Sequence, residues 1–166
     1  MRDKLTQADI DKMQEEIDHR KLVVRKEALK ALNEARAQGD LSENFEYYAA
    51  KQFKNQNESR IRYLENMIRT AIVVEDHSGQ DEVGLEKRIT VYFIDDDETE
   101  EYKMVTSVRG NSLKGLITGD SPLGAALMGH KTGETVRVKI NEHAGYDVKI
   151  LKVEDASDEE EQLRRF

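Results

Sequence analysis

The segment QGDLS, residues 38–42, decides the fold, because it is the one break in a long stretch that favours helix. Residues 6–70 hold no proline, and Gly39 is their only glycine. Glycine and proline are the residues that most often end a helix, so we expect one helix before the break and another after it. Each arm would have about 28–30 residues and a length of about 45 Å.

Apolar side chains on both sides of the break follow a helical repeat. They recur at steps of three, four and seven residues, which places them on one face of a helix. The first stripe is Ile10, Met13, Ile17, Val24, Ala28, Ala31 and Ala35; the second is Ala50, Phe53, Asn57, Ile61, Leu64, Ile68 and Ala71. Thr6 followed by Asp9 has capping-box spacing and marks the expected helix start. The two stripes predict an antiparallel helical hairpin over residues 1–74.

The second half of the chain has a different pattern, typical of strands. Alternating apolar residues predict a β-rich domain over residues 87–155. Its expected strands are 88–94, 101–108, 135–140 and 146–153. The segment from Ser121 to Gly129 predicts a short helix with Pro122 in its first turn. A linker over 75–86 and an acidic tail over 156–166 complete an α+β chain, and we expect the tail to be solvated.

Composition and charge narrow the classes of function. Among the 166 residues there is no cysteine, and no apolar run approaches the length of a membrane span, which predicts a cytoplasmic protein that does not contact membranes. The net charge is -8: residues 1–72 carry 14 basic and 13 acidic side chains, so residues 73–166 carry the remaining 12 and 21. A negative chain argues against non-specific binding to duplex DNA.

Acidic side chains gather at the break between the two predicted helices. Asp40, Glu43 and Glu46 fall within seven residues, beside Ser42 and Asn44. One interpretation is structural: Asp40 would cap the second helix and Glu43 would complete a capping box. The other is functional, because carboxylates are ligands that Mg²⁺ prefers. Two carboxylates cannot form a tight metal site alone, but they could complete one supplied by a partner.

Basic side chains are interleaved with acidic ones along both arms. Most are expected to be solvated, while Arg36 and Lys51 are candidates for RNA contact near the break. The chain has no phosphate-binding loop, dinucleotide fingerprint or nucleophile elbow. The sequence therefore offers no catalytic motif of its own beyond the acidic group at the break.

Two segments carry a resemblance to a known family. Residues 34–50, EARAQGDLSENFEYYAA, resemble the pattern AR-x-x-GDLSENAEY-x-AA of the bacterial Gre transcript-cleavage factors. Residues 117–129, ITGDSPLGAALMG, are similar to the family segment IS-x-x-SPLG-x-ALLG. The resemblance implies an N-terminal coiled coil and a C-terminal FKBP-like domain, and it covers roughly residues 5–153.

The resemblance also implies a function. The C-terminal domain would dock at the rim of the secondary channel of bacterial RNA polymerase through Ser121, Pro122, Leu123 and Gly124. The coiled coil would enter the channel, where Asp40 and Glu43 would help hold a Mg²⁺ ion shared with the polymerase while the backtracked RNA 3′ end is cleaved. Ser42, Asn44, Glu46 and Tyr47 would support the tip. The resemblance implies a monomer that stimulates the polymerase's nuclease activity, is no enzyme by itself and binds no cofactor tightly.

The sequence departs from the family pattern at several positions. Phe45 replaces a small alanine, Tyr48 stands where histidine is common, and residues 105–111 diverge. These changes leave open a second hypothesis, a channel-binding regulator that modulates or inhibits polymerase without cleavage. A third, prolyl isomerase activity, rests on fold analogy alone. Retention of both Asp40 and Glu43 favours the cleavage-stimulating factor.

Overall fold

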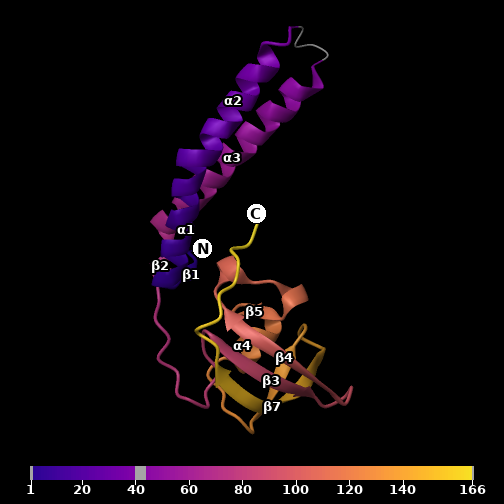
Figure 1. Ribbon diagram of the computed structural model, residues 1–166. Coiled ribbons are helices and arrows are strands. Elements are labelled where there is room, and N and C mark those ends of the chain that lie inside the picture. The colour runs from indigo at the N-terminus through magenta and orange to yellow at the C-terminus, as the bar shows by residue number, and fades with distance from the viewer. Residues whose placement is uncertain (1, 40–43, 166) are drawn as a thin grey trace. The chain divides into compact units, whose positions relative to one another are not determined.

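The computed structural model describes residues 2–39 and 44–165 and divides into two compact units. The division falls between Val73 and Val74. The first unit is a helical hairpin, and the second is a curled β-sheet with a short helix (Figure 1). The predicted α+β class is confirmed. Within the described ranges, no helix is long and apolar enough to cross a membrane.

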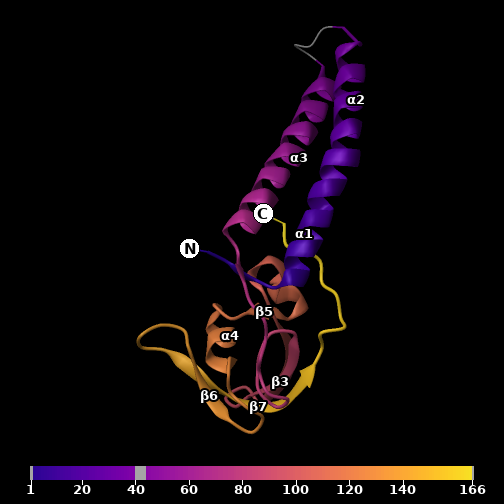
Figure 2. The same ribbon diagram turned by 90° about the vertical axis from the view of Figure 1, so that its left-hand side faces the viewer.

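Two helical arms lie side by side in the first unit (Figure 2). The first arm is α1 (Gln7–His19), a π-helical turn (Arg20–Val24) and α2 (Arg25–Arg36), and the second is α3 (Phe45–Thr70). The side chains buried between them are Met13, Ile17, Ala28, Leu32, Ala35, Ile61 and Leu64. Most of these belong to the two predicted stripes, so burial of one face of each arm holds the hairpin together.

The hairpin is closed at its base by a short parallel pairing. Strand β1 (Lys4–Leu5) pairs with β2 (Ile72–Val73), and Leu5 is fully buried. Just after β1, the predicted capping box at Thr6 is confirmed: its hydroxyl accepts a hydrogen bond from the Asp9 amide at 3.2 Å, and the Asp9 carboxylate accepts one from the Thr6 amide at 3.0 Å. The first helix therefore starts at a defined residue.

A polar network crosses the hairpin near the π-helical turn. The Glu16 carboxylate accepts hydrogen bonds from Arg60 Nε at 2.7 Å and from Arg20 Nε at 2.8 Å. The Asn57 side chain accepts one from Arg20 Nη1 at 3.0 Å and donates one to the Arg20 carbonyl at 3.3 Å. The Arg20 carbonyl also accepts the Arg25 amide within the π-helical turn, so Asn57 ties this turn to α3.

Glu16 makes the stability of the hairpin depend on pH. Burial raises the pKa of Glu16, but the hydrogen bonds and charges of Arg60 and Arg20 outweigh burial and hold the pKa below its ordinary value of 4.5. A carboxyl group with a lowered pKa stabilises the folded state above its unfolded pKa and loses that contribution as the pH falls. The contribution is therefore complete above pH 4.5 and declines as the pH falls through the lowered value.

We expect Glu16→Gln to lower the free energy of unfolding at neutral pH by about 2–4 kcal/mol, because it breaks a largely buried ion pair with Arg60. The difference from the wild type should shrink in acid, where Glu16 is protonated in both states. Urea unfolding followed by helical circular dichroism measures both effects. Glu15→Gln, on the exposed side of α1, is the matched control and should change stability by less than about 0.5 kcal/mol. Equal effects of the two changes would contradict the role of Glu16.

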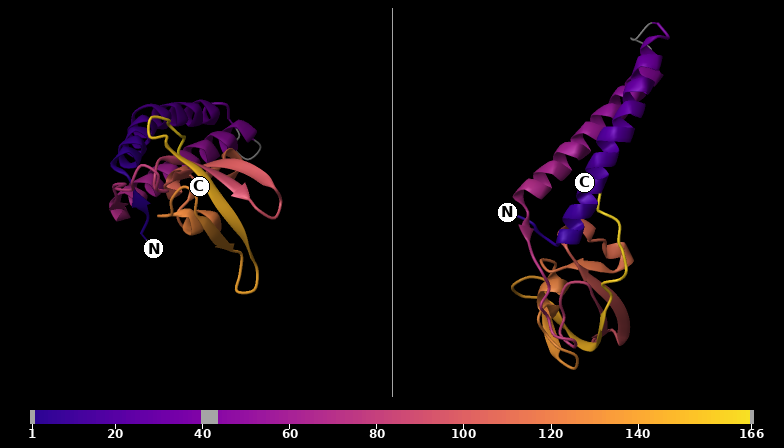
Figure 3. Two further views of the ribbon diagram at one scale, coloured as in Figure 1. Left: turned by 90° about the horizontal axis from the view of Figure 1, so that it is seen from below. Right: turned by 60° about the vertical axis from the view of Figure 1, so that its left-hand side comes forward.

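The second unit is a five-stranded sheet with the order β5-β4-β3-β7-β6. Its strands are β3 (Lys87–Phe93), β4 (Glu98–Val105), β5 (Leu116–Thr118), β6 (Thr135–Lys139) and β7 (Gly145–Asp155). All pairings are antiparallel except that of β4 with β5. The sheet curls around α4 (Pro122–Leu127), whose Leu127 is fully buried in the core (Figure 3).

Several predicted boundaries in this unit differ from the structure. The strand expected over 101–108 ends at Val105, and Ser107–Arg109 forms a 3₁₀ turn instead. Strand β5 was not expected, because three residues carry too little alternation to be recognised. In the segment expected as a linker, Val83 is 1% exposed and its amide donates a hydrogen bond to the His130 carbonyl. The end of that segment therefore packs into the core.

Most residues of the acidic tail are exposed, but Ala156 and Glu161 pack against the sheet unit. Ala156 is 3% exposed, and its amide donates a hydrogen bond to the Glu86 carbonyl at 2.8 Å. Further along, the Glu161 side chain is 9% exposed and pairs with Lys103 at 2.9 Å. Basic partners for these acids lie in β4 and the following turn, far away in sequence, which local composition does not reveal.

Candidate functional site

The site predicted from the sequence lies where the two arms of the hairpin meet. Helix α2 ends at Arg36 and α3 begins at Phe45, so Asp40 and Glu43 fall in the sequence between them, while Glu46 lies on α3. Asp40, Ser42 and Glu43 fall outside the described residues. The geometry of the site is therefore built from the residues on either side, Asn44, Glu46 and Tyr47 on α3 and Ala35 and Arg36 on α2.

Asn44 connects the two ends of this loop. Its side-chain oxygen accepts a hydrogen bond from the Tyr47 amide at 3.0 Å, which makes Asn44 the N-cap of α3. Its side-chain nitrogen donates to the Ala35 carbonyl at 2.8 Å, in the last turn of α2. One amide side chain thus caps one helix and ties it to the other. The expectation that Asp40 caps the second helix is wrong, because Asn44 fills that role.

Aromatic and basic side chains surround the start of α3. The Arg36 guanidinium lies over the Tyr47 ring at 5.8 Å from its centre, within the range of a cation–π contact. The Tyr47 and Tyr48 rings pack edge to face with centres 5.5 Å apart. Glu46 lies in the first turn of α3, where a negative charge interacts favourably with the helix dipole. The structure thus brings Arg36 and Tyr47 together from opposite arms.

Exposed aromatic and basic side chains lie along α3 from this end. Phe45 is 86% exposed and Tyr48 is 51% exposed. Tyr48 and Lys51 line a shallow groove with polar side chains from the next two turns of the helix. Exposed aromatic rings beside a cation are the features that stack bases and hold phosphates in single-stranded nucleic-acid sites. Phe45 was noted in the sequence only as a departure from a family pattern, although its position beside the acidic motif pointed to this surface.

The residues predicted for docking shape one end of α4. The Ser121 hydroxyl donates to the Thr118 carbonyl at 2.7 Å and accepts from the Gly124 amide at 3.1 Å, so Ser121 is the N-cap of α4. Leu123 packs against the core, and Gly124 is buried. Pro122 is exposed in the first helical turn. Ser121, Leu123 and Gly124 therefore fix the shape of the α4 start, and Pro122 is the member available to a partner.

A cluster of buried charges in the sheet unit was missed in the sequence. Lys103 on β4 is 1% exposed, and Arg109 is 7% exposed. The carboxylates of Glu86 and Glu161 lie against both cations. The only sequence signal was a pair of basic residues within a strand-forming segment near an acidic tail. Among the residues that the structure describes, no group of three or more possible ligands is arranged to hold a metal ion.

Each unit matches one half of a two-part class of transcription elongation factors. Residues 4–73 match the family model described as "Transcription elongation factor, N-terminal", and residues 77–155 match "Transcription elongation factor, GreA/GreB, C-term". The chain belongs to the GreA/GreB family of transcription elongation factors.

Individual relatives agree with this assignment. The chain is 42% identical to transcription elongation factor GreA of Streptococcus pneumoniae (strain G54) and 37% identical to that of Staphylococcus saprophyticus, in each case over 90% of this chain and 94% of the relative. Among solved structures, it is similar to the transcription factor Gfh1, with a TM-score of 0.46 and 25% identity over 92% of this chain and 97% of that one. Gfh1 of Thermus thermophilus gives a TM-score of 0.43 and 25% identity, over 92% of this chain and 99% of that one.

Proposed function

We propose that this elongation factor binds bacterial RNA polymerase and stimulates the intrinsic cleavage of backtracked RNA 3′ ends, which rescues arrested complexes. The observation that supports the proposal is that the two helix ends on either side of Asp40 and Glu43 are held together. Asn44 ties the first turn of α3 to the last turn of α2, and both Asp40 and Glu43 lie in the chain between Arg36 and Asn44. A narrow two-helix arm is a suitable shape for entering the secondary channel of the polymerase.

The chemistry proposed for the tip is assistance to a site that the polymerase already holds. Asp40 and Glu43 would supply carboxylate oxygens, a donor type that fits Mg²⁺. A magnesium ion shared with the polymerase would activate the attacking water and stabilise the leaving oxygen. The role of Asn44 would be to limit the motion of the loop ends, so that less entropy is lost when the carboxylates are positioned. Burial inside the polymerase would strengthen each charge interaction.

Two further surfaces would support this function. Tyr48 and Lys51 would contact the RNA 3′ end by stacking and charge, and Arg36 would add a second cation from the opposite arm. The sheet unit would dock at the channel rim through the α4 start, where Ser121, Leu123 and Gly124 hold Pro122 in place. The hairpin would then carry the chemistry and the sheet unit the binding.

We expect the isolated chain to have no nuclease activity on labelled RNA with Mg²⁺, because two carboxylates in bulk water compete poorly with the hydration shell of this ion. Cleavage should appear only when a backtracked polymerase complex is added. Electrophoresis of end-labelled transcripts, with and without polymerase, measures this difference. Cleavage products without polymerase would make the chain an enzyme by itself. Binding to polymerase with no stimulated cleavage would instead favour a channel-binding regulator.

A further inference from the structure

The chain's own C-terminal tail lies along one side of a groove on the sheet unit. Its walls are the segment from Arg109 to Thr118 together with Arg88 and Lys103, and residues 159–165 lie along it. The family match of this unit ends at residue 155, so the segment in the groove follows the matched region. The groove and its occupant belong to one compact unit.

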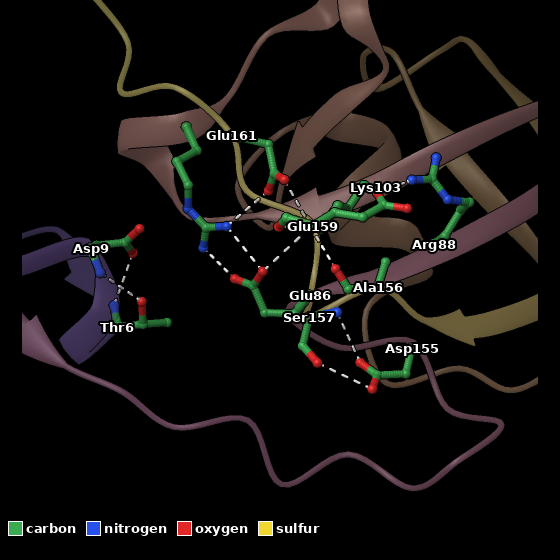
Figure 4. A network of polar contacts seen from close by, with 11 residues as sticks. Thr6, Asp9, Glu86, Arg88, Lys103, Asp155, Ala156, Ser157, Glu159 and Glu161 are labelled. Atoms are coloured by element: carbon green, nitrogen blue, oxygen red, sulfur yellow. Dashed lines mark hydrogen bonds and ion pairs between the residues drawn. The ribbon is translucent and has the colours of Figure 1, made fainter. Parts of the chain in front are cut away.

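Lys103 makes three hydrogen bonds to the tail. Its ammonium group donates to two main-chain carbonyls, Ala156 at 2.8 Å and Glu159 at 3.0 Å, and to the Glu161 carboxylate at 2.9 Å (Figure 4). Two of the three contacts recognise the backbone and one recognises a side-chain charge. The Glu159 amide also donates to the Ala156 carbonyl at 3.1 Å, so Lys103 binds a turn that is followed by a carboxylate at Glu161.

Other groups hold the tail on both sides of Lys103. Arg109 Nη1 donates to Glu161 at 3.0 Å, and Arg88 pairs with Glu159. The Arg164 amide donates to the Val108 carbonyl at 2.6 Å. Contacts therefore extend from Ala156 to Arg164 along the tail.

Four charged side chains meet beside the tail, two of each sign. Lys103 and Arg109 are two cations, and Glu86 and Glu161 are the two carboxylates against them, with every side chain of the four 22% exposed or less. Without Glu161, one carboxylate in this group would face two cations. A buried charge is costly unless it is paired, so an open groove attracts another carboxylate.

We infer that this groove is a binding site for an acidic peptide segment of a partner protein that adopts a turn like that of the tail, and that the tail is its intramolecular competitor. A partner segment binds by placing one carboxylate between Lys103 and Arg109 and its carbonyls on Lys103. The tail must leave for this to occur. The inference goes beyond the proposed function, because neither polymerase nor RNA takes part in it.

The tether makes the tail a strong competitor. The tail follows β7 directly, and even a short flexible tether gives a segment an effective concentration in the range of about a millimolar. A free peptide at micromolar concentration therefore cannot displace the wild-type tail. Replacing Glu161 should weaken the contacts of the tail with Lys103 and Arg109. The tail should then leave more readily, while Lys103 and Arg109 themselves stay unchanged.

The test uses the full chain and a labelled peptide with the sequence of residues 156–165, ASDEEEQLRR, with both ends blocked. Fluorescence anisotropy should show the peptide binding to Glu161→Gln at least about tenfold more tightly than to the wild type. Glu160→Gln is the matched control, because it changes the same charge in the same segment at an exposed residue, and it should bind as weakly as the wild type. A peptide with glutamine at the position of Glu161 should lose the tight binding to Glu161→Gln.

Thermal unfolding establishes that each variant is folded at the assay temperature. If Glu161→Gln unfolds, Glu161→Asp provides a second variant, which keeps the charge but shortens the side chain, and it should also bind the peptide more tightly than the wild type. Equal peptide binding by the wild type and a folded Glu161 variant would overturn the inference. Equal binding of the two peptides would overturn it as well, because the carboxylate would then have no role.

Discussion

Replacing Asp40 and Glu43 together by alanine is expected to reduce stimulated transcript cleavage by roughly 100- to 1000-fold, while affinity for the polymerase stays unchanged. The magnitude is that of removing a group that stabilises charge in a buried transition state. Affinity should persist because docking is assigned to the sheet unit, which contains neither residue. Cleavage of stalled elongation complexes and a separate binding assay measure the two quantities.

The structure simplifies the interpretation of this experiment. Because Asn44 is the N-cap of α3, the double change leaves that cap in place, and the helix content of α3 should be the same as in the wild type. Asp40→Asn is a useful single variant, since it keeps the size of the side chain and removes its charge. Asn44→Ala instead tests the link between α2 and α3. Loss of the N-cap should cost about 1 kcal/mol of helix stability. A double mutant that still stimulates cleavage would exclude the proposed role of the carboxylates.

Gly124→Ala is expected to destabilise the sheet unit by at least about 3 kcal/mol, beyond the usual cost of an added methyl group in a packed core. A Cβ atom at Gly124 would meet the Thr118 carbonyl and the Ser121 hydroxyl closer than 3.0 Å, a separation that Cβ atoms essentially never show. The first of these neighbours is backbone, so α4 would have to move. Calorimetry should show a lower melting temperature, by roughly 10–20 °C, together with weaker polymerase binding.

Ala125→Gly is the control for this prediction. Ala125 is exposed in the same helix, and its replacement should cost about 0.5–1 kcal/mol through backbone entropy alone. Polymerase binding should then be close to that of the wild type. If Gly124→Ala were as stable as this control, the tight contact between α4 and the Thr118 backbone would not determine the docking surface.

The parts of the fold that depend on local pattern could be predicted from the sequence. The hairpin follows from two apolar stripes around one glycine, and the Thr6 capping box and the α4 start follow from residues within one turn. The π-helical turn could not be predicted, because it involves the contact of Arg20 with Asn57, 37 residues away. Strand β5 is too short to show a period, and it depends on pairing with β4.

Prediction of the candidate site was limited in the same way, because it too depends on contacts between residues that are far apart in the sequence. The spacing of Asp40 and Glu43 is compatible with a capping box. Sequence spacing alone does not show that Asn44 is the N-cap of α3 instead. Asn44 has an advantage that spacing does not reveal, since its amide also reaches Ala35 on the opposite arm. Likewise, the pairing of Glu161 could not be predicted, because its partners Lys103 and Arg109 lie 58 and 52 residues away and are brought near by the sheet.

The β1–β2 pairing at the base of the hairpin has a consequence for how such a protein can evolve. Lys4 pairs with Ile72 and Leu5 with Val73, so the chain enters and leaves the hairpin at neighbouring positions. Adding equal numbers of residues to both arms leaves the β1–β2 pairing unchanged. One heptad in each arm would extend the reach by about 10 Å. The length of the hairpin can therefore change without any change at its base or in the sheet unit.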